Sequence, residues 1–147
     1  MTADDFLAWI TPPAQEMCTK YDLPYQVCVA QAAIESEWGE AGIGCGGFNL
    51  FGRKWNGNGS YVLLPTQEEV NGVMVQIFAR FQSYPSLADA IEDWCYLITE
   101  EPCYAPCLQY RHDIEQFVRT LAPIYATRST YADDILATIR ACFPGAV

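Results

Sequence analysis

The chain has 147 residues, a length that fits one domain with a core of its own. Its 18 acidic and 8 basic residues give a formal net charge of −10, which argues against nucleic acid or an acidic lipid surface as a partner. The one histidine, His112, excludes a zinc site with two histidine ligands, and a catalytic triad would have to use it. Mostly carboxylate chemistry remains, and we expect neither a metal nor a cofactor.

The first quarter of the chain predicts three helices. Thr2 and Asp5 have the spacing of a capping box and open a short helix. A second helix is predicted over 11–21, because the pair Pro12-Pro13 is tolerated in a first turn. Apolar residues then recur at helical spacing and predict a third helix over 24–38.

A glycine-rich segment follows the third predicted helix. Eight of the ten glycines fall between Gly39 and Gly59. Such clustering indicates a long irregular loop in which the backbone comes close to other groups or takes positive φ. Aromatic and apolar residues interleaved with these glycines argue for an ordered loop: Phe48, Leu50, Phe51, Trp55 and Tyr61.

Two strands, 66–70 and 73–81, are predicted after the loop. They flank Asn71-Gly72, the pair that best provides the positive φ of a type I′ hairpin turn. In this register Glu68 pairs with Val75 and shares the apolar face of the hairpin. Glu68 is therefore a carboxylate in an unexpected place; a charge at a strand edge or a slipped register is the alternative.

Helical periodicity returns after the hairpin. Helices are predicted over 87–98, through a segment that ends near Leu121, and over 131–142, the last introduced by Thr130 and Asp133. The chain contains no internal repeat or linker, so residues 1–147 are expected to form one domain. Its fold class is α+β, mostly helical with one small hairpin.

The seven cysteines include no C-x-x-C pair and mostly stand among apolar residues. We interpret them as buried thiols that act as small hydrophobic side chains. Cys103 and Cys107 are four residues apart and could form one pair.

Glu35 is the first candidate for a catalytic acid. On a helix that continues to Trp38, Gln31 and Trp38 share its face, whereas Glu37 points away. Partial desolvation beside a tryptophan raises the pKa of a carboxyl group, which suits a general acid near neutral pH. The alternative is a solvated glutamate on an acidic helix. Two carboxylates in different environments, Glu35 and Glu68, are what glycoside hydrolysis requires.

Several stretches resemble the signature of family-73 glycoside hydrolases, the endo-β-N-acetylglucosaminidases of bacterial autolysins, flagellar peptidoglycan hydrolases and phage lysins. The first two are Ala30-Gln-Ala-Ala-Ile-Glu-Ser-Glu-Trp-Gly39 and Phe48-Asn-Leu-Phe-Gly52. The resemblance continues through 66–72, 81–93 and 125–133, in the order of the family and over nearly the whole chain. It implies a lysozyme-like fold, mostly helical with a small β-hairpin lobe.

The resemblance also implies roles for single residues. Glu35 matches the catalytic acid of the family, Glu68 matches the glutamate of its mobile hairpin, and Tyr125 matches a tyrosine near the acetamido group of the substrate. Aromatic faces bind sugar rings well, although Phe51 could equally belong to the core. The residues expected to bind the glycan are Gln31, Trp38, Asn49, Phe51 and Tyr84.

The expected function is hydrolysis of peptidoglycan at the β-1,4 bond between N-acetylglucosamine and N-acetylmuramic acid. Glu35 would protonate the departing oxygen. Either Glu68 activates water for inversion, or the acetamido group of the substrate attacks while Tyr125 orients it. The alternatives are a muramidase or lytic transglycosylase on the same fold, and a non-catalytic glycan-binding module of a phage tail or flagellar rod.

The expected partner is the glycan strand of peptidoglycan, bound by a monomer without nucleic acid or membrane. No run approaches the ~20 apolar residues of a membrane span. The first residues have neither the basic nor the apolar region of a signal peptide. Two routes to the cell wall are therefore expected: a phage-type lysin released by a holin, or a domain taken from a secreted protein.

Overall fold

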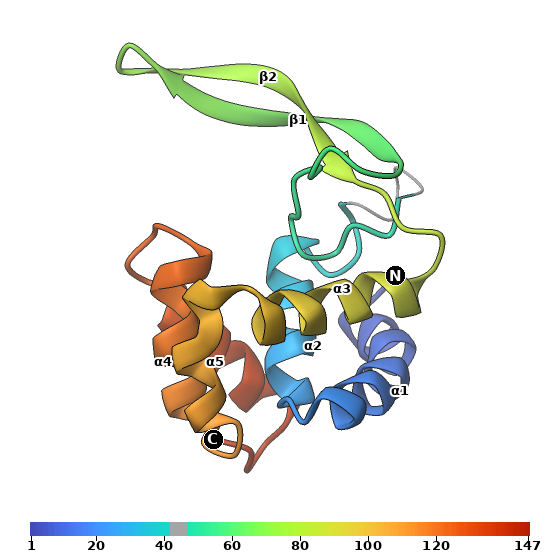
Figure 1. The fold of residues 1–147 in the computed structure, drawn as a ribbon, viewed down its shortest axis with the longest axis vertical. Helices are drawn as coiled ribbons and strands as arrows, with labels where there is room; N and C mark the ends of the chain where they lie inside the picture. The colour runs from blue at the N-terminus through green and yellow to red at the C-terminus, as the bar shows by residue number, and fades with distance from the viewer. Residues whose placement is uncertain (42–46) are drawn as a thin grey trace.

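The computed structural model of the protein describes residues 1–41 and 47–147 (Figure 1). The helices are α1 (Ala3–Tyr21), α2 (Tyr25–Glu35), α3 (Leu87–Glu100), α4 (Ile114–Tyr125) and α5 (Tyr131–Cys142), and the 3-10 helix η2 (Pro102–Tyr110) connects α3 to α4. One antiparallel sheet is present in the described ranges, formed by β1 (Tyr61–Val70) and β2 (Val73–Gln82). The predicted α+β, mostly helical architecture is confirmed, and the bounds 131–142 of the last helix match.

The N-terminal helix α1 is continuous, so the prediction of two separate helices is wrong. The capping box at its start is confirmed, because Thr2 Oγ1 accepts from the Asp5 amide at 3.0 Å and Asp5 Oδ2 accepts from the Thr2 amide at 3.1 Å. The helix continues through the Pro12-Pro13 pair although proline removes backbone donors. One buried stripe at four-residue spacing explains this, since its burial outweighs the lost hydrogen bonds. Its members are Phe6, Ile10, Ala14 and Cys18.

Helix α2 lies at the centre of the helical body. All residues from Val27 to Ala33 are buried, including Gln31. A helix that is covered on every side belongs to a core, and α2 packs against α1 on one side and α5 on another (Figure 1). Among the described residues, no helix has both the length and the apolar character needed to cross a membrane.

The helix α2 ends at Glu35, three residues before the predicted end at Trp38. Ser36 Oγ donates to the carbonyl of Ala32 at 2.6 Å and accepts from the Gly39 amide at 3.0 Å, which closes the helix locally. Residue 38 has left-handed backbone, with φ of 58°. The helical face that was predicted to place Trp38 beside Glu35 therefore does not exist.

The hairpin has the predicted register, with Glu68 opposite Val75, and the turn residues Asn71 and Gly72 have φ of 53° and 81°. Strand β1 begins at Tyr61, five residues earlier than predicted, because the alternation of side chains continues back to that point. One face of the hairpin is half-buried at its base, and the other is exposed. In Figure 1 the two strands form an arm that projects from the helical body.

The six described cysteines are free thiols. Cys18, Cys28, Cys95 and Cys107 are buried, which confirms the interpretation of these four as small hydrophobic side chains. Cys103 is exposed and is not paired with Cys107. Cys45 lies outside the described residues.

Candidate active site

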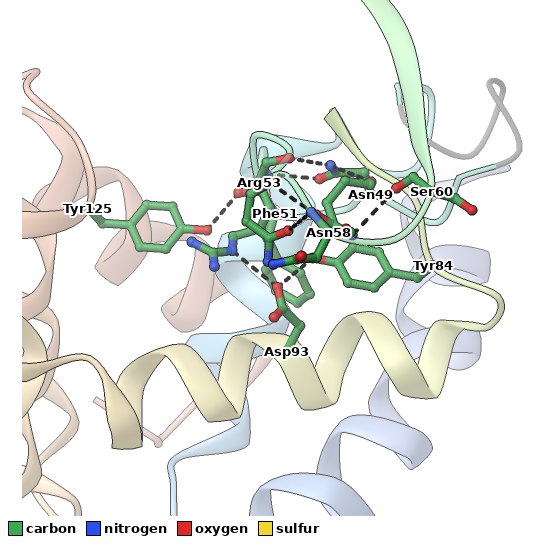
Figure 2. Close-up of polar contacts among 10 residues, drawn as sticks. Asn49, Phe51, Arg53, Asn58, Ser60, Tyr84, Asp93 and Tyr125 are labelled. Carbon is green, nitrogen blue, oxygen red and sulfur yellow. Dashed lines mark hydrogen bonds and ion pairs between the residues drawn. The ribbon is translucent and has the colours of Figure 1, made fainter. Parts of the chain in front are cut away.

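The loop before the arm is held by Asn49, whose amide is nearly buried (Figure 2). Its Nδ2 donates to the carbonyls of Arg53 at 2.7 Å and Gln82 at 2.9 Å, and its Oδ1 accepts from the Arg53 amide at 3.0 Å. The Gln82 amide in turn donates to the Arg53 carbonyl at 2.9 Å. Both amide hydrogens of Asn49 are used inside the protein, so this residue fixes the loop to the base of the arm.

The loop places Phe51 and Gly52 against the helical body. The buried ring of Phe51 stacks on Trp94 with centroids 6.3 Å apart. At Gly52, φ is +67°, and a Cβ would lie 3.2 Å from Glu35 Oε2. Both observations require glycine, because a side chain would strain the backbone and crowd the carboxylate. The loop backbone thus packs directly on Glu35.

Glu35 is half-buried at the end of α2, and its carboxylate is held by a residue to which no role was assigned from the sequence. Its Oε1 accepts from the hydroxyl of Tyr131 at 2.7 Å. That hydroxyl accepts from Gln31 Nε2 at 3.0 Å, and Gln31 Oε1 accepts from Trp94 Nε1 at 2.7 Å. The motif 125–133 contains Tyr131, but only the fold reveals that the first residue of α5 meets the last residue of α2.

Gln31 and Trp38 both belong to the interior more than to a surface. The side chain of Gln31 is fully buried, with 0% exposed surface, and is hydrogen-bonded at both ends of its amide. Trp38 packs edge-on against Phe6 with ring centroids 5.8 Å apart. The geometry therefore favours Gln31 as a support for other side chains and Trp38 as part of the core boundary.

Tyr125, at the end of α4, lies beside Tyr131 with nearly parallel rings and centroids 6.1 Å apart. Its hydroxyl donates to the Phe51 carbonyl at 2.6 Å (Figure 2). Burial, followed by the neighbouring Tyr131 and Glu35, raises the pKa of Tyr125, which keeps its hydroxyl protonated. A polar cavity of about 130 Å³ adjoins it, lined by Phe51, Gly52, Arg53, Lys54, Tyr104 and Tyr125.

An ion pair ties the loop to α3. Arg53 Nε donates to Asp93 Oδ2 at 3.1 Å, and the same oxygen accepts from the hydroxyl of Tyr84 at 2.5 Å (Figure 2). Burial, reinforced by the hydrogen bond to Asp93, raises the pKa of Tyr84. Tyr84 also lines a separate hollow of about 480 Å³ between α3 and the end of α1. It joins the site through Asp93 and Arg53 and does not touch Glu35.

Glu68 lies on the arm, apart from this cluster. Its Oε1 is 3.5 Å from Lys54 Nζ, and the two side chains are 47% and 64% exposed. Lys54 lines the polar cavity beside Tyr125, so the pair extends from the cavity toward the arm. The structure brings Gln31, Glu35, Asn49, Phe51 and Tyr125 together around one loop, and it places Glu68 across from them on a separate element.

The comparisons with known proteins agree with this arrangement. The family model described as mannosyl-glycoprotein endo-beta-N-acetylglucosaminidase matches residues 11–142. The peptidoglycan hydrolase FlgJ of Escherichia coli K12 is 36% identical over 134 residues, which cover 86% of this chain and 42% of FlgJ. The exo-glucosaminidase LytG of Bacillus subtilis is 30% identical, over 91% of this chain and 49% of LytG. The chain thus spans less than half the length of these relatives.

Among solved structures, the catalytic domain of the autolysin Auto from Listeria monocytogenes superposes with a TM-score of 0.84 at 30% identity. The match covers 95% of this chain and 84% of that domain. The helical body with its two-stranded arm is thus the lysozyme-like fold that was expected. The chain belongs to the glucosaminidase family, family 73 of the glycoside hydrolases.

Proposed function

We propose that this domain hydrolyses peptidoglycan as an endo-β-N-acetylglucosaminidase, cleaving the β-1,4 bond between N-acetylglucosamine and N-acetylmuramic acid. The observation that carries the proposal is the setting of Glu35. A half-buried carboxylate lies at the junction of α2, α5 and the aromatic loop, with one oxygen held by the buried hydroxyl of Tyr131. Glu35 packs against Gly52, which lines the polar cavity. A carboxyl group fixed in this way has the geometry of a general acid for a glycosidic oxygen.

Two routes can complete the reaction. In the first, Glu68 activates a water molecule for inversion, which suits a carboxylate separation of ~6.5–9.5 Å in the complex. In the second, the acetamido group of the substrate attacks, and Tyr125 orients it. Closure of the arm over the glycan would complete the site in the first route, since Glu68 now pairs with Lys54 on the exposed side.

The role of Glu35 is tested by Glu35→Gln, which keeps the shape of the side chain and removes the acid. We expect clearing of purified cell walls to be abolished, with an unchanged unfolding temperature. Glu37→Gln is the matched control, because this exposed carboxylate lies two residues away. Substantial clearing by Glu35→Gln would remove Glu35 from the central role.

The bond that is cleaved is read from the products. Mass spectrometry of digested peptidoglycan should find new N-acetylglucosamine reducing ends. N-acetylmuramic acid ends would indicate a muramidase, anhydro ends would indicate a lytic transglycosylase, and glycan binding without products would indicate a binding module. One relative is named an exo-glucosaminidase, so fragment lengths also matter. Internal cleavage gives long fragments early, whereas exo cleavage releases only terminal units.

We further propose that the domain acts on the cell wall as a monomer and takes the glycan strand as its partner. Analytical ultracentrifugation with and without soluble glycan tests the monomer. Both routes to the wall, a phage-type lysin and a domain of a secreted protein, lead to the same substrate. A neighbouring holin gene would favour the first.

A further inference from the structure

A chain of hydrogen bonds runs from the core to the carboxylate of Glu35. Trp94 Nε1 donates to Gln31 Oε1 at 2.7 Å, Gln31 Nε2 donates to the Tyr131 hydroxyl at 3.0 Å, and that hydroxyl donates to Glu35 Oε1 at 2.7 Å. The first three side chains are buried. This series of hydrogen bonds joins α3, α2 and α5, so three elements of the core converge on one carboxylate oxygen.

Each hydrogen bond in this series has only one possible direction. The indole N–H of Trp94 can only donate, which requires the amide oxygen of Gln31 to face it. The amide nitrogen of Gln31 must then face Tyr131 and donate to its oxygen. The single hydroxyl hydrogen of Tyr131 is left for Glu35. The chemistry of the donors thus fixes both the orientation of the amide and the direction of the hydroxyl.

We propose that Tyr131 is a positioning residue that keeps the transferable proton of Glu35 on Oε2. Oε1 already accepts a hydrogen bond from the Tyr131 hydroxyl. A proton on that same oxygen would make it a poorer acceptor and weaken this bond, so the proton is favoured on Oε2. Oε2 faces Gly52, and it accepts no hydrogen bond from the residues that the structure describes. This inference rests on the proposed role of Glu35 and adds which of its oxygens carries the proton.

The surroundings keep Tyr131 protonated. Burial, followed by the charge of Glu35, raises the pKa of Tyr131 well above its ordinary value. The titratable groups around it come from neighbouring elements: Tyr125 from α4, and Arg128, whose guanidinium lies 4.6 Å from the centroid of the Tyr131 ring. Arg53 acts on Tyr125 from the loop side. Arg128 is itself paired with Asp134 at 3.2 Å, which limits its effect on the hydroxyl.

The test is Tyr131→Phe, which removes the hydroxyl and keeps the ring. A hydrogen bond to an ionised carboxylate favours the ionised form, so the pH profile is a readout that a merely structural role of Tyr131 would not move. We expect the alkaline limb of the pH profile of kcat to move up by about one pH unit, and the plateau to fall about tenfold. Gln31→Met frees the hydroxyl to turn away, and we expect a smaller shift in the same direction.

The matched control is Tyr21→Phe. Tyr21 donates to Glu92 Oε2 at 3.1 Å on the surface, so this variant also removes one bond between a tyrosine and a carboxylate. Its pH profile should match that of the original protein. Thermal unfolding of every variant separates a change of chemistry from a loss of fold.

A folded Tyr131→Phe variant with an unmoved alkaline limb overturns the proposal. If Tyr131→Phe does not fold, Gln31→Met decides, and an unmoved limb there overturns it equally. Activity that survives Glu35→Gln contradicts the proposed role of Glu35, on which this inference rests. An inactive Glu35→Gln variant beside an unchanged Tyr131→Phe profile contradicts only the positioning role.

Discussion

The two glutamates of the candidate site lie in contrasting regions of the molecule. Glu35 ends a helix in the helical body and is held by a hydrogen-bond chain from buried residues. Glu68 lies on a two-stranded arm, where its carboxylate pairs with the exposed side chain of Lys54 at 3.5 Å. A lone hairpin has little stability of its own, whereas a core helix opens only with the whole domain. The difference agrees with the proposal that Glu35 in the body is the fixed acid and that Glu68 on the arm is an adjustable group.

Gly52→Ala should have the largest effect, and it tests whether the helical body must hold Glu35 in one position. The added Cβ would lie 3.2 Å from Glu35 Oε2 and displace the carboxylate or the loop. A misplacement of about 1 Å of a reacting group can cost about a hundredfold in rate. The close contact adds to the strain of a side chain at positive φ, so we expect a loss of up to that order in wall hydrolysis. Gly57→Ala is the matched control, because Gly57 also has positive φ, of +94°, but nothing lies within 4 Å of its Cβ. Equal losses in both variants would attribute the effect to backbone strain.

Glu68→Gln tests the role of the carboxylate on the arm. If the acetamido group of the substrate attacks, the loss should be about tenfold, smaller than the loss for Glu35→Gln. Removal of a general base costs more, on the order of a hundredfold to ten-thousandfold. Initial rates on purified walls, measured side by side for both variants, distinguish the routes. A loss equal to that of Glu35→Gln counts against substrate assistance.

Lys54→Met should have the smallest effect. The pair of Lys54 with Glu68 is exposed on both sides, and such pairs contribute about 0–1 kcal/mol to stability. We expect an unfolding temperature close to that of the original protein and a rate within about threefold of it. The rate should also depend less on salt, because the variant lacks the screened pair. A large loss of activity would show that Lys54 has a direct role in the polar cavity.

The sequence was most informative where local chemistry decides the structure. The Asn71-Gly72 turn determines the register of the arm, and the Thr2–Asp5 capping box marks the start of α1. It was misleading where tertiary packing overrides a local signal. The buried stripe of α1 carries the helix through Pro12-Pro13, and the side chain of Ser36 ends α2 before its apolar pattern ends.

The candidate site follows the same division. The motifs identified Glu35, Asn49 and Phe51, which the structure places around one loop, but they did not show that Asn49 is a clamp. Tyr131 received no role, since its relation to Glu35 spans 96 positions of sequence. Contacts of this kind arise from the packing of α2 against α5, and no local pattern encodes them.

The arm is anchored at its base, so a rotation there moves its outer part the most. The Gln82 and Trp55 amides donate to the carbonyls of Arg53 and Arg80 at 2.9 and 3.0 Å, and Asn49 adds its clamp at the same point. Glu68 lies seven residues beyond the start of β1, roughly 23 Å along the strand at about 3.3 Å per residue. The pair of Glu68 with Lys54 must part before the arm turns, and a rotation of about 10° at the base then carries a group at this distance along the strand by up to ~4 Å. A small hinge angle is thus amplified into a displacement of atomic size at the one place where the arm carries Glu68.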